Sequence, residues 1–67
     1  MPVAKVIEIS ASSGDSFEDA IRAGLAKAGT SVHGIQGAWI NEQSVSVDGN
    51  GTISEFRVNM RVTFVLD

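Results

Sequence analysis

Most of residues 52–66 alternate between apolar and polar side chains, and no other feature of the sequence constrains the fold as strongly. Every second side chain from residue 56 onward is apolar, in the order Phe56, Val58, Met60, Val62, Phe64 and Leu66. The neighbouring positions carry Glu55, Arg57, Asn59, Arg61 and Thr63. Because successive side chains of a strand point to opposite faces of a sheet, the pattern predicts one long strand with a core face and a polar face.

The chain is too short to bury a large core by itself. It has 67 residues, no cysteine and one histidine, so disulfides and a structural metal are largely unavailable as stabilising links. A chain of this length removes only roughly 60% of its unfolded surface from water. We therefore expect a single domain over residues 1–67 that gains the missing stability by forming a homo-oligomer.

A helix is predicted over residues 17–33. Ser16 is a good N-cap, because its hydroxyl can accept from the free amides of the first turn, and Gly34 is a natural stop. Glycine costs about 1 kcal/mol of helix propensity, so Gly24 on the apolar face indicates a close approach of helix to sheet. That face has three- and four-residue spacing and consists of Phe17, Ala20, Ile21, Gly24, Leu25, Ala28 and Val32.

Two further strands complete the expected α+β fold. Residues 3–10 are rich in β-branched side chains, and residues 37–47 lead into the sequence DGNG at 48–51, a strong hairpin signal. The order is therefore β-α-β-β, with strand three in the middle of an antiparallel sheet of order 1-3-2. Strand three would be about 46 Å long and the helix about 25 Å, so the sheet must curl or a neighbouring subunit must complete the burial.

The length of the hairpin loop decides which residues of strands two and three face each other. A two-residue loop would set Trp39 opposite Met60 and Glu42 opposite Arg57. A three-residue loop with Gly51 in a left-handed bulge position would set Trp39 opposite Arg61, Gln43 opposite Arg57 and Ile40 opposite Met60, and we favour this register. It gathers one polar surface, which either binds a ligand or is only solvated or paired between subunits, from Trp39, Asn41, Gln43, Arg57, Asn59 and Arg61.

Charge and motifs exclude several functions. The net charge of -3 provides no basic surface for nucleic acid. The apolar stretches are far shorter than the roughly 20 residues that span a membrane, and the N-terminus has no signal-peptide pattern, so we expect a soluble cytoplasmic protein. There is no nucleophile-elbow, phosphate-loop, zinc or dinucleotide motif, and we do not expect an enzyme. His33 is expected in the last helical turn, near the exposed carbonyls, and not in a catalytic or metal site.

Three stretches together resemble the dodecin family of very small β-α-β-β proteins: VAKVIEISASS at 3–13, SFEDAIRAGLAKA at 16–28 and FRVNMRVTFVLD at 56–67. The resemblance covers nearly the whole chain. It implies an antiparallel sheet curled around one helix, assembled as a hollow homododecamer that binds or stores a small molecule without catalysis. The family's usual ligands are flavins (FMN, riboflavin or FAD), stacked in pairs at a subunit interface.

The resemblance also implies which positions contact a flavin. Flavin-binding members have a tryptophan early in strand two that stacks on the ring, and a glutamine in strand three that bonds the ring edge. In this chain Arg57 takes the place of that glutamine. When residues 42–43 are set on the family's acid-glutamine pair, the stacking position falls two residues before the tryptophan. The cofactor-binding residues expected from the resemblance are Gly37, Trp39, Gln43 and Arg57.

Other dodecin-like proteins bind cations such as calcium, and the stretch INEQSVSVDGNG at 40–51 is more similar to that kind. Carboxylates suit a hard cation, and one carboxylate per subunit around a threefold axis is enough to make a site. The candidate metal ligands are Glu42, Asp48 and Glu55. Flavin, calcium and a purely structural oligomer without flavin are the alternatives that the sequence leaves open.

Overall fold

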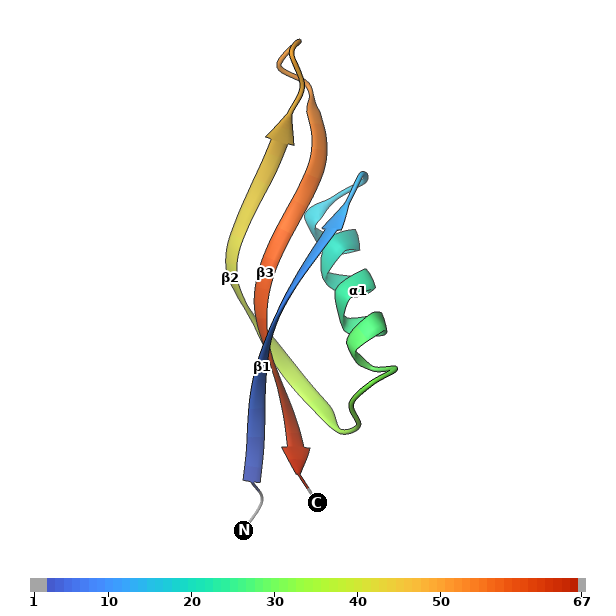
Figure 1. Cartoon of the computed structure of the whole chain (residues 1–67), viewed down its shortest axis with the longest axis vertical. Helices are drawn as coiled ribbons and strands as arrows, with labels where there is room; N and C mark the ends of the chain where they lie inside the picture. The colour runs from blue at the N-terminus through green and yellow to red at the C-terminus, as the bar shows by residue number, and fades with distance from the viewer. Residues whose placement is uncertain (1–2, 67) are drawn as a thin grey trace.

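A computed structural model describes residues 3–66 and has the expected β-α-β-β order. Strand β1 (Val3–Ser13) is followed by helix α1 (Phe17–Ala28), strand β2 (Ile35–Val47) and strand β3 (Ile53–Leu66). The three strands form one antiparallel sheet of order β1-β3-β2, with the helix on one side of it (Figure 1). This confirms the predicted fold class and the central position of the alternating strand.

Helix α1 begins where predicted and ends earlier. Ser16 is the N-cap, and its Oγ accepts from the Asp19 amide at 3.0 Å. The helix stops at Ala28 and not at residue 33, because Gly29, Thr30 and Ser31 have low helix propensity and form a turn. The Thr30 hydroxyl also donates to the Lys27 carbonyl at 2.7 Å and so satisfies one carbonyl of the last turn.

Two predictions that depended on the longer helix are therefore wrong. His33 lies beyond the helix and not in its last turn. Gly34 does not end the helix but has a φ of 74° at the entry to β2, where its carbonyl accepts from the Val65 amide at 3.1 Å. A left-handed φ is available to glycine at little cost, so Gly34 directs the chain into the sheet instead.

The strand ends differ from the predicted ones by two or three residues. β1 continues to Ser13 and not to residue 10, because Ala11 and Ser13 still pair with β3, opposite Val58 and Phe56. β2 starts at Ile35, opposite Phe64, two residues before the predicted start. Continued pairing with the long central strand thus lengthens both of its neighbours.

The register of the hairpin agrees with the favoured prediction next to the turn, where Val47 faces Ile53, and again further along β2, but departs from it in between. Trp39 faces Arg61, Ile40 faces Met60, and Gly51 has a φ of 80°, as expected for the three-residue loop. Two irregularities, one between Ser46 and Val47 and a β-bulge between Ile40 and Glu42, bound a segment whose pairing is shifted by one residue. Because Asn41 is the extra residue, Glu42 faces Asn59 and Gln43 faces Val58, so the prediction that Gln43 faces Arg57 is wrong.

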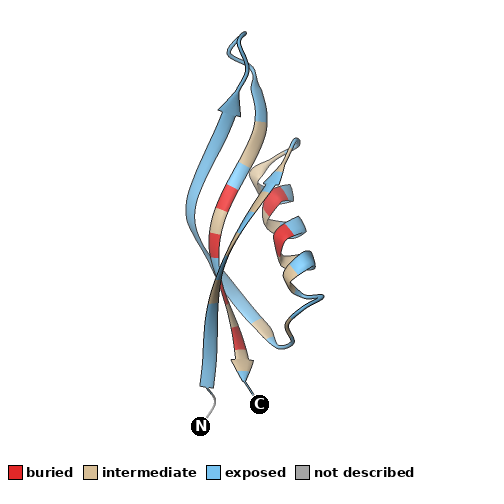
Figure 2. Cartoon of the chain, viewed as in Figure 1, coloured by how far each residue is buried: buried red, intermediate tan, exposed pale blue. Residues whose placement is uncertain are grey.

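The core lies where α1 crosses β1 and β3. Val58, Met60 and Val62 of β3 are fully buried, together with Ala20 of the helix (Figure 2). Gly24 faces this cluster, and a Cβ there would stand 2.9 Å from the Ala11 Cβ, so the close approach predicted from the sequence is confirmed. The apolar face of the helix is therefore matched to the apolar face of the central strand.

A large part of the sheet has no cover within one chain. The molecule extends 53 × 19 × 13 Å, and a twelve-residue helix is only about 18 Å long. Strand β2 is exposed along almost its whole length (Figure 2). The large apolar side chains left exposed are Val3, Val6, Trp39, Ile40, Val45, Val47, Ile53 and Leu66. Within residues 3–66, no helix has both the length and the apolar character needed to cross a membrane.

Candidate ligand site

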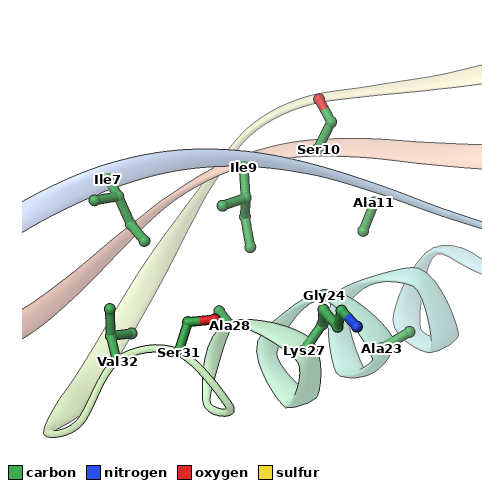
Figure 3. Close-up of a pocket in the computed structure, with 10 residues that line it drawn as sticks. All are labelled: Ile7, Ile9, Ser10, Ala11, Ala23, Gly24, Lys27, Ala28, Ser31 and Val32. Carbon is green, nitrogen blue, oxygen red and sulfur yellow. The ribbon is translucent and has the colours of Figure 1, made fainter.

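An apolar hollow of about 480 Å³ lies between helix α1 and strand β1 (Figure 3). Ile7 and Ile9 point from β1 toward the helix, and Ala28 and Val32 lie on the opposite side. Among the residues that the structure describes, Lys27 is the only charged one that lines it. The hollow therefore offers apolar contact area but few groups that could orient a polar ligand.

A second hollow, of about 390 Å³, has the opposite character, and we call it the polar cavity. All three strands contribute to it: the central strand β3 supplies two of the lining residues, β1 supplies one and β2 supplies three. In the strand register, Ser10, Asn59 and Glu42 form one row and Arg57 and Ser44 belong to the next. The lining residues are Ser10, Glu42, Gln43, Ser44, Arg57 and Asn59.

A chain of hydrogen bonds crosses the sheet at the polar cavity. The Ser10 hydroxyl of β1 donates to Asn59 Oδ1 of β3. Asn59 Nδ2 in turn donates to Glu42 Oε1 of β2 at 3.3 Å. The Asn59 amide makes a hydrogen bond with both neighbouring strands, which fixes its orientation. The hydrogen bond from Asn59 also keeps the Glu42 carboxylate at the cavity.

Arg57 brings the positive charge of the polar cavity. Its NH2 nitrogen donates to Glu55 Oε1 at 2.9 Å, which is a salt bridge along the same strand. The Arg57 side chain is still 56% exposed, so this contact is screened by water. A guanidinium has five N–H donors and no acceptor, and the remaining donors are free for a ligand that presents oxygen atoms.

The four residues expected to hold a flavin are only partly brought together. Gln43 and Arg57 both line the polar cavity. Trp39 faces Arg61, which is four residues from Arg57 along β3, so Trp39 is about 13 Å away along the strand. Its side chain is 65% exposed. Gly37, opposite Thr63, is further away still and does not line the cavity.

The three candidate metal ligands lie apart. Glu42 is in the polar cavity, and Glu55 is engaged by Arg57. Asp48 is in the hairpin turn, where its Oδ1 accepts from the amides of Asn50 at 2.9 Å and Thr52 at 3.1 Å. In the described part of the chain, no three His, Cys, Asp or Glu side chains come together as metal ligands would.

Sequence reasoning missed Ser10 as a member of the site. Ser10 reaches the cavity because β1 pairs with β3 so that Ser10 faces Asn59. The parity of the first strand already places Ser10 on the side opposite Ile7 and Ile9, and pairing that polar side with Asn59 would have found it.

The family model for Dodecin matches residues 3–67 of the chain. A search of curated proteins finds no significant match.

Solved structures similar to this chain are dodecins from several bacteria. A point mutant of the dodecin from Thermus thermophilus superposes with a TM-score of 0.93 at 27% sequence identity, covering 100% of this chain and 98% of that one. The dodecin from Streptomyces davaonensis gives 0.92 at 27% identity, covering 98% and 96%. A calcium-chelating immunodominant antigen of Mycobacterium tuberculosis, called calcium dodecin, gives 0.83 at 35% identity, covering 97% and 91%.

Proposed function

The chain belongs to the dodecin family, and on that basis we propose that it binds a small molecule in a homododecameric shell, each chain contributing a single domain. Ligand binding or storage, without catalysis, is the role that family membership supports. A small molecule and further copies of the chain are the partners we propose, in the cytoplasm, with no membrane and no nucleic acid involved. The net charge of -3 agrees with the last point, since nucleic acid is bound by basic surfaces.

Exposed apolar surface supports the assembly. The helix leaves β2 uncovered, and Ile40 and Val45 are 37% and 40% exposed on it. The apolar hollow beside α1 is a further uncovered surface, for which we propose a second copy of the chain as the occupant. Native mass spectrometry tests the assembly, with twelve chains per particle expected. A monomer at micromolar concentration would contradict it.

The polar cavity is the observation that carries the ligand proposal. It combines donors and acceptors from three strands, and Trp39 is exposed on the same face. We propose that the ligand is a flavin, with Gln43 and Arg57 at the ring edge. We propose that Trp39 stacks on the ring from a neighbouring copy, because within one chain it is too far along the strand. Gly37 then leaves room for the ring instead of stacking on it.

The protein purified without added cofactor provides the test of the flavin proposal. A yellow preparation that releases FMN, riboflavin or FAD is the expected result, and riboflavin fluorescence should be quenched on adding the stripped protein. Trp39→Ala should weaken riboflavin binding by about two- to tenfold, since aromatic stacking contributes about 0.5–1.5 kcal/mol. Trp39→Phe, which retains a ring, is the matched control. A shell that neither carries nor quenches any flavin would overturn this proposal.

Calcium is the second candidate ligand, favoured by the 35% identity to the calcium dodecin. Because no three acidic side chains within residues 3–66 come together as ligands, we propose that Glu42, Asp48 or Glu55 meets its symmetry copies around an axis. Calcium added to chelator-treated protein should then raise the melting temperature. Glu42→Gln, Asp48→Asn and Glu55→Gln are compared with Glu18→Gln on the exposed helix face as the control. No change in melting temperature or particle size on adding calcium would exclude the site.

A further inference from the structure

Two opposite charges line the polar cavity without neutralising each other. Glu42 faces Asn59, and Arg57 is two residues from Asn59 on the same face of β3. Diagonal neighbours of this kind are roughly 7–8 Å apart between Cα atoms. The salt bridge that Arg57 makes within residues 3–66 is with Glu55, on its own strand. A carboxylate and a guanidinium therefore stand on two sides of a cavity with space between them.

The free atoms of Glu42 are acceptors. Its Oε1 takes the hydrogen bond from Asn59 Nδ2, and Asn59 is held in turn by Ser10. Its other carboxylate oxygen makes no hydrogen bond to the described residues. This oxygen is positioned to accept from a ligand N–H, because the Ser10 and Asn59 contacts restrict how the carboxylate can turn.

The free atoms of Arg57 are donors. One NH2 group is directed at Glu55, and the rest of the guanidinium fork is available to an oxygen acceptor. A simple anion is a poor match for the cavity as a whole, because Glu42 would repel it. A simple cation bound inside the cavity of one chain is equally poor, because Arg57 would repel it.

We infer that Glu42 and Arg57 together recognise the edge of a planar heterocycle in which a carbonyl oxygen and a ring N–H are adjacent. Arg57 donates to the carbonyl oxygen, and Glu42 accepts from the ring N–H. In this assignment two side chains divide the donor and acceptor functions that a single amide side chain combines. The inference rests on the proposed function, since it concerns the ligand edge bound in the same cavity.

Riboflavin and 3-methylriboflavin are the probes for a test by flavin fluorescence quenching with the assembled protein. The methyl group removes the ring N–H and leaves both neighbouring carbonyl groups in place. The wild-type protein should bind riboflavin at least about tenfold more tightly than the methylated probe, because a hydrogen bond to a charged group contributes about 1.5–3 kcal/mol.

Variants of the two residues should affect the probes differently. Glu42→Leu should weaken riboflavin binding about tenfold and leave 3-methylriboflavin binding unchanged, so the discrimination between the probes disappears. Glu42→Gln retains a carbonyl acceptor and should retain most of the discrimination. Arg57→Leu should weaken both probes by the same factor, because both have the carbonyl oxygen. Glu18→Gln, on the exposed face of the helix and outside the cavity, is the control and should change neither affinity.

The outcomes separate this inference from the proposed function. Equal affinity of the wild-type protein for both probes would overturn the inference and leave flavin binding intact. A Glu42→Leu variant that still discriminates between the probes would also overturn it. An assembled shell that binds neither probe would overturn the flavin proposal itself, and this inference with it. Native mass spectrometry and melting temperature confirm that each variant is folded and assembled.

Discussion

Gly24 lies so close to Met60 that a Cβ on the glycine would stand 2.6 Å from the methionine Cε. The pair joins the middle of helix α1 to the middle of the central strand, where Met60 is fully buried. Because Gly24 has no side chain, the end of the Met60 side chain reaches the helix backbone, and the helix lies close against the sheet. The packing of the core therefore depends on residue 24 having no Cβ atom.

Replacing this glycine tests that dependence. Gly24→Ala should lower the free energy of unfolding by about 1–2 kcal/mol, because the overpacking outweighs the gain of about 1 kcal/mol in helix propensity. Met60 can move its flexible end, but the Ala11 Cβ at 2.9 Å cannot move without its strand. Urea denaturation followed by circular dichroism at fixed protein concentration measures the change. Gly14→Ala, with no atom within 4 Å of the new Cβ, is the matched control, and an equal effect of both substitutions would refute the argument.

The N-cap of helix α1 also contributes to stability through a single atom, the Ser16 Oγ. Ser16→Ala removes the acceptor of the Asp19 amide and should cost about 0.5–2 kcal/mol of stability. Ser16→Asp should restore most of it, since a carboxylate accepts the same bond and favours the positive end of the helix dipole. Thermal unfolding of the three proteins gives the comparison, with the exposed Ser46→Ala as the control. Equal melting temperatures for Ser16→Ala and Ser46→Ala would contradict the capping role.

Phe64 extends the core toward the end of β3. It is only 9% exposed, so Phe64→Ala should destabilise the protein by about 3–5 kcal/mol. Leu66, two residues further on the same face, is 46% exposed, and Leu66→Ala should cost less than half as much. Denaturant unfolding at one protein concentration compares them, since oligomer stability depends on concentration. If the two variants had the same stability, the core would not reach Phe64 in the way described.

A charged substitution tests whether the uncovered face of β2 is an interface between copies of the chain. Val45→Lys places an ammonium group on a strand with almost no cover in one chain, and the particle should fall apart into smaller species because a buried lysine lacks a partner. Ala26→Lys, at an exposed position of the helix, is the control and should leave the particle intact. Native mass spectrometry and far-UV circular dichroism report the size and the fold separately. A Val45→Lys protein of wild-type size would show that this face is not an interface.

The fold was predictable because the strongest pattern in the sequence marks the central strand, with which both other strands pair. The alternation from Phe56 to Leu66 identifies both the central strand and its core face, and the topology follows from that position. The helix end was not predictable from the apolar spacing. Val32 continues the periodic pattern, but the low propensity of Gly29, Thr30 and Ser31 ends the helix first.

The candidate site was predictable only in outline, because it lies between two irregularities in the β2–β3 pairing. Asn41 forms the bulge that turns Glu42 toward Asn59, and its side chain donates to Glu8 of β1 at 3.2 Å. Nothing in the local sequence requires a bulge at this position, since it results from contacts between three strands. An irregularity between Ser46 and Val47, next to the turn, shifts the pairing by one residue, and the Asn41 bulge shifts it back. A register argument from the turn therefore fails only for the residues between these two points.

The pairing of the first and last strands has a consequence for how the chain folds. Val3 lies opposite Leu66, so β1 and β3 form a ladder between segments that are almost a full chain length apart, whereas β2 and β3 are joined by a short turn. Closing the larger loop costs more conformational entropy before any contact stabilises it. The β2–β3 hairpin is therefore expected to form early, and the docking of β1 is expected to limit the folding rate. Until β1 docks, the apolar face of β3 is open to other copies, so folding and assembly compete for the same surface.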